Sequence, residues 1–304
     1  MTNGINRVLD KRHFDKFRPE TYTDAWYSGS GESVGVLEDD AFNDDAAASS
    51  WSSELEEIHE EPTRNGWIDV YERNRVIDTS RELLKGGGRT VLEFGASDGY
   101  MIEEMKAAFP DNTFIATDLM REGLVKSYSR NPDILHIRCD FTDAPFAADS
   151  VDYIYSLNVL EHIEADTKTI AECFRILKPG GFCLFVVPRG ADLYDYFDEM
   201  LFHQRRYDKG ELRSKCESAG FHIIDNYHYA WLCYPLFWMK KKWNRFIGKR
   251  LSEEEKIKRV KSDIDQAMAS PFAIGLMHFE HRMSKLVRPK FGVREFILCQ
   301  KGGL

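Results

Sequence analysis

The sequence contains no uninterrupted apolar run of about 18 residues, the length that a membrane-spanning helix needs. Its start, MTNGINRVLDKRHFDKF, lacks the apolar core of a secretory signal. Six cysteines are present, but no two of them form a CxxC pair, which disfavours a metal site or a disulfide framework. These absences predict a protein of the reducing cytoplasm that has no metal site and no membrane span.

Basic residues are scarce in residues 1–64, which carry the net charge of the whole chain. This segment has 15 Asp or Glu against 6 Lys or Arg, and the formal charge of the chain is −9. Such a composition buries too little apolar surface to fold alone. We expect an acidic N-terminal extension, anchored by Trp26, Tyr27 and Trp51, that is either a flexible lid over a site or an uninvolved tail.

Strand-like and helix-like segments alternate through the rest of the chain, 65–304. Strands are predicted at 90–94, 113–117, 134–138, 151–156 and 182–187, and helices near 99–109, 120–130 and 166–176. This alternation predicts a parallel sheet with helices on both faces. A helix within 63–88 precedes it, with Trp67, Val70, Tyr71 and Val76 on one face. A further helix and a sixth strand are predicted within 211–229, and a last strand within 293–303.

A glycine-containing loop ends the first strand in VLEFGASDGY, residues 91–100. Gly95 and Gly99 allow the backbone to approach a ligand closely, and the following helix points its N–H groups at that ligand. The dinucleotide-binding fingerprint would require glycines at 95, 97 and 100. Because Ser97 and Tyr100 stand at two of these positions, a nicotinamide or flavin site is disfavoured.

Acidic residues end the next two strands. Asp118 lies 23 residues after Gly95, near the distance of about 20 at which a carboxylate meets ribose hydroxyls in nucleoside sites. The alternative is a solvated strand end. Asp140, which follows the third strand, either belongs to the same site or caps a short following turn.

Two further segments complete an ordered set. Asn158-Val159-Leu160-Glu161-His162 follows the fourth strand, and KPGG, residues 178–181, opens the fifth. In this order and spacing the motifs resemble those of the class I S-adenosylmethionine-dependent methyltransferases. The family's loop usually carries a glycine where this chain has Ser97.

The resemblance implies a Rossmann-like, seven-stranded, mostly parallel sheet with helices on both faces. Its last strand is expected to be antiparallel and inserted between strands five and six. It implies S-adenosyl-L-methionine as the cofactor, with Asp118 on the ribose, Asp140 on the adenine amino group and Phe141 over the ring. The implied cofactor-binding residues are Glu93, Gly95, Ala96, Ser97, Gly99, Asp118, Leu119, Asp140, Phe141 and Asn158.

The segment 188–212 follows the fifth strand, where the methyl acceptor is expected. Its phrase His203-Gln204-Arg205-Arg206-Tyr207 resembles a subset of these enzymes linked to polysaccharide and glycan assembly. His203 is the candidate general base, because imidazole titrates near working pH, and His162 is the next candidate. Arg206 is expected to clamp an acidic sugar or phosphate, and Tyr207 to stack on a ring. The alternative is that His203 and Arg206 anchor the loop to the sheet.

An insertion at about 230–289 begins with aromatic and basic residues in 229–251. This composition is typical of a helix at a membrane interface. The alternative is a helical insert that packs on the core or on a second subunit of a homo-oligomer. Nucleic-acid binding is disfavoured by the acidity of the whole chain.

The activity implied by the resemblance is methyl transfer by direct in-line displacement, with O-methylation of a small polar, sugar-like or lipid-linked acceptor as the expected reaction. Two alternatives stay open. One is an N- or C-methyltransferase, and the other is a cofactor-binding regulator or scaffold, because fold does not determine function.

Overall fold

A computed structural model describes residues 37–38, 66–268, 271–283 and 287–303. The expected anchors Trp26, Tyr27 and Trp51, and the choice between lid and tail, lie outside these residues. No helix among the described residues is long and apolar enough to cross a membrane.

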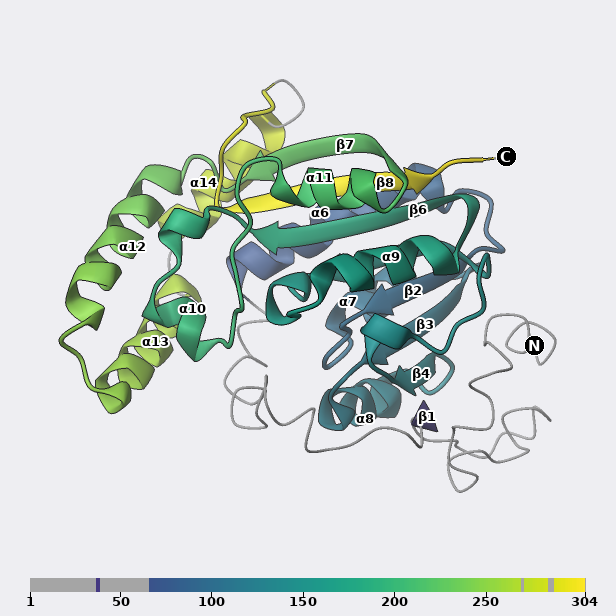
Figure 1. Cartoon of the computed structure of the whole chain (residues 1–304), viewed down its shortest axis with the longest axis horizontal. Helices are drawn as coiled ribbons and strands as arrows, with labels where there is room; N and C mark the ends of the chain where they lie inside the picture. Colours follow the sequence, from purple (N-terminus) through teal and green to yellow (C-terminus); the bar gives the residue numbers. More distant parts are fainter. Residues whose placement is uncertain (1–36, 39–65, 269–270, 284–286, 304) are drawn as a thin grey trace.

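One mixed sheet organises the fold (Figure 1). Its neighbouring strands run in parallel, except that β8 is antiparallel to both β6 and β7. In spatial order the strands are β1 (Leu37–Glu38), β4 (Leu135–Arg138), β3 (Thr113–Asp118), β2 (Thr90–Phe94), β5 (Val151–Leu157), β6 (Leu177–Pro188), β8 (Arg294–Lys301) and β7 (Phe221–Tyr229). The seven-stranded prediction, with its last strand antiparallel and inserted, is confirmed. The two-residue β1 adds an eighth strand from the segment that was expected to be an extension.

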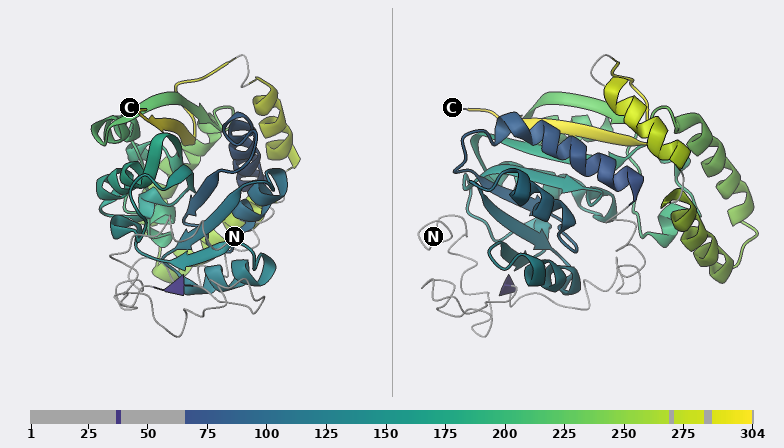
Figure 2. Two further views of the ribbon diagram at one scale, coloured as in Figure 1. Left: turned by 90° about the vertical axis from the view of Figure 1, so that its right-hand side faces the viewer. Right: turned by 180° about the vertical axis from the view of Figure 1, so that it is seen from behind.

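Helices cover both faces of the sheet (Figures 1 and 2). One face carries α9 (Asp166–Ile176) and α11 (Glu211–Ser218), and the other carries α6 (Trp67–Leu83), α7 (Tyr100–Ala108) and α8 (Arg121–Arg130). Successive side chains of a strand point to opposite faces. In β5, Ile154 therefore joins one core while Tyr153 and Tyr155 join the other. This explains why the central strands read as continuous apolar runs.

Two elements differ from their predicted form. Tyr71 and Val76 of α6 are buried as expected, but Val70 is exposed, so the buried face of this helix is narrower than its apolar positions suggest. β6 begins at Leu177 instead of 182, because Leu177 already pairs with Val151 ahead of a register shift. The KPGG segment is therefore a bulged start of the strand.

The insertion between β7 and β8 forms three helices, α12 (Tyr234–Gly248), α13 (Glu253–Met268) and α14 (Pro271–Met283). α12 and α13 lie with the short helix α10 (Tyr196–Met200) beyond the carboxyl end of β6 (Figure 1). α14 packs beside α6 on one face of the sheet, as the view from behind shows (Figure 2). The insertion thus adds a helical group next to the edge of the sheet where ligands bind in open α/β folds.

Candidate functional site

The predicted site residues gather at one edge of the sheet because each follows the carboxyl end of a parallel strand. β2 leads to the glycine loop, β3 to Asp118, β4 to Asp140, β5 to Asn158 and β6 to the segment that contains His203. The topology therefore brings together residues that are more than 100 positions apart in the chain.

The glycine loop has a left-handed backbone at three positions. The φ angles are +78° at Gly95, +43° at Ser97 and +76° at Gly99. A Cβ at Gly95 would collide with the side chain of Val159, and one at Gly99 with Ser127, so both positions require glycine. Ser97 is thus a residue with a side chain in the left-handed conformation that favours glycine.

Asp118 connects the end of β3 to the glycine loop. Its Oδ2 accepts a hydrogen bond from the Ser97 amide at 2.8 Å, and its Oδ1 accepts one from the Met120 amide at 2.8 Å. The carboxylate is only partly buried, and each of its oxygens has a second lone pair. It lies beside the buried Ala96 and the partly exposed Leu119.

The side chains of Asp140 and Phe141, which follow β4, both have partners within the protein. The carboxylate of the exposed Asp140 accepts from the Thr142 amide at 2.8 Å and caps a 3-10 turn over Phe141–Asp143, as the alternative had it. The side chain of Phe141 is buried and stacks on Phe94 with ring centroids 4.2 Å apart. The ring thus belongs to the core, and its contact with a bound adenine stays a prediction.

Two polar residues near the loop have buried partners. Burial raises the pKa of Glu93 well above its usual value, although the hydroxyl of Tyr155 donates to Oε2 at 3.1 Å. The amide of Asn158 donates to Oε2 of Glu72 on α6 at 2.8 Å. Asn158 thus joins the loop after β5 to the helix that precedes the sheet.

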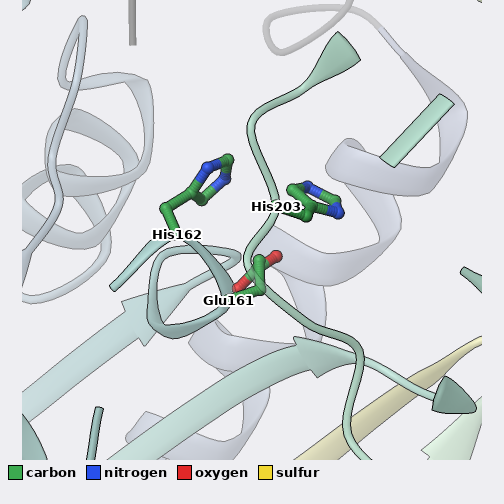
Figure 3. A group of neighbouring side chains, drawn as sticks. All are labelled: Glu161, His162 and His203. Atoms are coloured by element: carbon green, nitrogen blue, oxygen red, sulfur yellow. The ribbon is translucent and has the colours of Figure 1, made fainter. Parts of the chain in front are cut away.

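Glu161, His162 and His203 form a group where the turn after β5 meets the loop after β6 (Figure 3). One ligand atom from each residue lies within 4.8 Å of the others, and the two imidazole rings meet edge to face. Burial raises the pKa of Glu161 to about 8, against the lowering effect of Arg294. The guanidinium of Arg294 faces this carboxyl group, with Nη1 3.9 Å from Oε1 of Glu161.

Asp198 anchors the loop that follows β6. Its Oδ1 accepts from Nη1 of Arg206 at 2.8 Å and lies 2.9 Å from Nδ1 of His203, while its Oδ2 accepts from Lys241 at 2.6 Å. Burial lowers the pKa of His203 to about 4, even though Asp198 opposes the shift. The imidazole is therefore neutral at physiological pH.

Arg206 and Tyr207, the two predicted substrate-binding residues, form hydrogen bonds with other parts of the protein. Arg206 is buried, and its Nε donates to the carbonyl oxygen of Arg189, which is the arrangement of a loop anchor. Tyr207 is fully buried, and its hydroxyl donates to Oδ2 of Asp166 at 2.7 Å. The expectation that Tyr207 stacks on an acceptor ring is wrong, because protein atoms enclose the ring.

Sequence reasoning did not place Glu72, Asp198 or Arg294 near the site. Nε of Arg294, at the start of β8, lies 3.3 Å from Oε1 of Glu72, and both side chains are largely buried. No local motif marks this pair, because its members are more than 200 residues apart. Asp198 had a local signal, the acidic stretch DLYDYFDE before His203, which also forms the capping box of α10.

Known proteins resemble this chain in the part that contains the glycine loop and the strand ends described above. Residues 92–185 match the model of a methyltransferase domain. A protein of Mycolicibacterium smegmatis, described as a probable S-adenosylmethionine-dependent methyltransferase, is 30% identical over 157 residues, covering 51% of this chain and 60% of the relative. The chain thus spans three-fifths or less of the length of the first curated relatives that it matches.

Solved structures share the fold at low sequence identity. Phosphoethanolamine N-methyltransferase 2 of Haemonchus contortus, in complex with S-adenosyl-L-methionine, has a TM-score of 0.58 at 15% identity over 88% of this chain and 62% of that one. The [4+2]-cyclase SpnF has a TM-score of 0.52 at 16% identity, covering 76% and 81%. These likenesses show a common architecture, which proteins of different activity share.

Proposed function

We propose that this chain, which has the fold of the class I S-adenosylmethionine-dependent methyltransferases and carries a methyltransferase domain at residues 92–185, methylates a hydroxyl of a small polar acceptor. The observation that carries the proposal is the convergence at one edge of the sheet. The left-handed glycine loop and Asp118 lie there, and so do two histidines in a group of their own.

The residues of the glycine loop fit the cofactor. Positive φ angles at Gly95, Ser97 and Gly99 make a tight turn into α7, whose first N–H groups face the site. Asp118 holds the Ser97 amide at the end of β3, the place at which a carboxylate meets ribose hydroxyls in nucleoside sites. When bound, S-adenosylmethionine supplies a methyl group that its sulfonium already activates.

The acceptor side supports a hydroxyl acceptor over an amine. His203 is neutral at physiological pH, and if its Nδ1 carries the proton toward Asp198, its Nε2 can accept one. A free amine or a carboxylate needs no such base. Since Arg206 and Tyr207 are engaged within the protein, we propose that acceptor specificity comes from the Glu161–His162–His203 group.

We further propose that the acceptor is presented at an anionic membrane surface, with α12 as the contact. Leu236, Met239, Trp243 and Phe246 follow one another at intervals of three or four residues, and each is at least 53% exposed. α12 contains no acidic residue, and Lys249 and Arg250 follow it. A helix that turns apolar and aromatic side chains outward beside basic ones suits a lipid headgroup region.

Calorimetry with S-adenosylhomocysteine tests the proposed function. Wild-type protein is expected to bind one equivalent, and Asp118→Ala should weaken binding by roughly 1–3 kcal/mol, the cost of hydroxyls that lose a charged acceptor. Asp118→Asn keeps an acceptor oxygen for only one of the two backbone amides, so thermal melts of both variants show whether the loop structure survives. Asp111→Ala is the control, since this residue lies in the turn before β3, at the opposite edge of the sheet. Absence of binding by the wild type would refute the proposal.

A further inference from the structure

The group of Glu161, His162 and His203 has the composition of a metal site. One carboxylate and two imidazoles are the donors that divalent first-row transition metals prefer. The donors come from two segments, the 3-10 turn after β5 and the loop after β6, and Figure 3 shows the three side chains converging between them. The lack of a CxxC pair predicted no metal site, but a CxxC pair is a local pattern, whereas His162 and His203 are 41 residues apart in the sequence.

Glu161 is a buried carboxyl group whose oxygens accept no hydrogen bond from the described part of the protein. Its side chain is 0% exposed, and neither oxygen has a hydrogen-bond partner among the described residues. Arg294 approaches one oxygen only to 3.9 Å, which is beyond hydrogen-bond distance. Burying such a group without a partner costs free energy, so a ligand that occupies it would remove this cost.

The environment of His203 suits a metal ligand. Its Nδ1 lies 2.9 Å from Oδ1 of Asp198, a carboxylate that Arg206 and Lys241 also hold. A carboxylate that accepts from Nδ1–H leaves the proton off Nε2 and fixes the ring, which is the usual arrangement behind a metal-bound histidine. Asp198 thus acts as a positioning residue.

We propose that Glu161, His162 and His203 bind one divalent transition-metal ion. The donor atoms span up to 4.8 Å, whereas ligands at about 2.1 Å in a tetrahedral site lie roughly 3.4 Å apart. The group therefore contracts by up to about 1.4 Å when the metal binds, which side-chain rotation of the partly exposed His162 can supply.

Three protein ligands leave coordination positions open, and this gives the metal a role. In this respect the inference rests on the proposed function. The open positions take one or two oxygens of the acceptor, so an acceptor with vicinal hydroxyls, as in a sugar, can chelate the ion. The metal lowers the pKa of the coordinated hydroxyl, whose proton passes to solvent. With the metal bound, Nε2 of His203 is a ligand, so the metal replaces this imidazole in activating the hydroxyl and in favouring a hydroxyl acceptor.

Titration with Zn²⁺ after removal of metals by a chelator tests the site, in untagged protein and without cofactor. We expect one equivalent to bind, with at least tenfold weaker binding in Glu161→Gln and in His162→Gln. His278→Gln, which removes an exposed histidine of α14, should leave the affinity unchanged. The same titration with Co²⁺ should give a ligand-field absorption spectrum in the wild type that both site variants lose.

Binding with unchanged affinity in both site variants, or no binding by the wild type, would overturn the metal proposal. Thermal melts of each variant show whether it is folded, and His162→Gln keeps the test valid if the change at the buried Glu161 unfolds the chain. Affinity for S-adenosylhomocysteine, measured on the same samples, reports separately on the proposed function. A protein that binds this cofactor product but no metal would refute the inference alone.

Discussion

Ser97 holds a backbone conformation that costs an L-residue about 1–2 kcal/mol. Ser97→Gly should therefore raise the free energy of unfolding by roughly 0.5–1 kcal/mol, after the entropy that glycine gains in the unfolded chain is subtracted. Urea denaturation measures this change. Ser214→Gly, at an exposed position within α11, is the control and should lower stability by up to about 1 kcal/mol. A loss of stability at position 97 would mean that the hydroxyl contributes more than the strain costs.

His136 should make the protein sensitive to mild acid. Burial lowers its pKa to about 4, whereas the unfolded chain titrates near 6.5. Below pH 6.5 the imidazole binds a proton in the unfolded state but stays neutral in the folded state. The free energy of unfolding therefore falls as the pH drops from about 6.5 to about 4. This one group should remove about 2 kcal/mol between pH 7 and pH 5.

His136→Gln tests this contribution, because an amide can keep partners in Ser127 and Ile134 without a titrating group. The difference in unfolding free energy between pH 7 and pH 5 should shrink by about 2 kcal/mol in the variant. His222→Gln changes an exposed histidine on β7 and is expected to leave that difference as it is. An equal pH dependence in His136→Gln and wild type would contradict the assignment.

At the scale of elements, α12 is the unusual one, since its polar side faces the protein. Lys241 and Asn244 are buried, and Lys241 donates to Asp195 at 2.7 Å and to Asp198 at 2.6 Å. These ion pairs connect the insertion to the loop that carries His203. The apolar stripe must then point away from the core, which explains how large side chains come to be exposed.

Replacing Trp243 and Phe246 together by serine should weaken binding to vesicles of phosphatidylcholine and phosphatidylglycerol. Each side chain contributes about 1.5–3 kcal/mol when it is buried, or roughly tenfold or more in partitioning. Co-sedimentation measures this, and Ile224→Ser, an exposed apolar residue of β7, is the control. Pure phosphatidylcholine and high salt should both reduce binding of the wild type. If the wild type ignores both vesicles and sediments as a dimer that the double variant dissociates, α12 is a subunit contact.

The elements of the sheet could be predicted from the sequence because buried parallel strands are short apolar runs between polar turns. The orientation of α12 could not, because Asp195 and Asp198 lie more than 40 residues before Lys241 and no local pattern joins them. At the site, the glycine loop and Asp118 were located because they follow strands directly. The role of Tyr207 was misjudged, since a motif does not reveal which way an aromatic ring points.

At the scale of the whole molecule, β1 lies at the edge of the sheet beside β4 and contributes two residues. Deleting residues 1–55 should therefore preserve a cooperative thermal transition, because seven strands and both cores remain. If the acidic segment is a lid whose Trp26 and Trp51 dock near the site, turnover should fall with any acceptor that the wild type methylates. Deleting only residues 1–34 keeps β1 and separates the effect of that strand. A truncated chain that fails to fold would place the extension in the core, and one with full turnover would make it a tail.

The position of β8 has a consequence for folding during synthesis. β7 pairs with β8 alone among the described strands, and the ribosome makes β8 only after the whole insertion 234–283. Until β8 is made, β7 has no neighbouring strand to pair with. The guanidinium of Arg294 is likewise absent from its position beside Glu72 and Glu161. A nascent chain can thus form the glycine loop early, whereas the contacts of Arg294 with Glu72 and Glu161 can form only in the last step of synthesis.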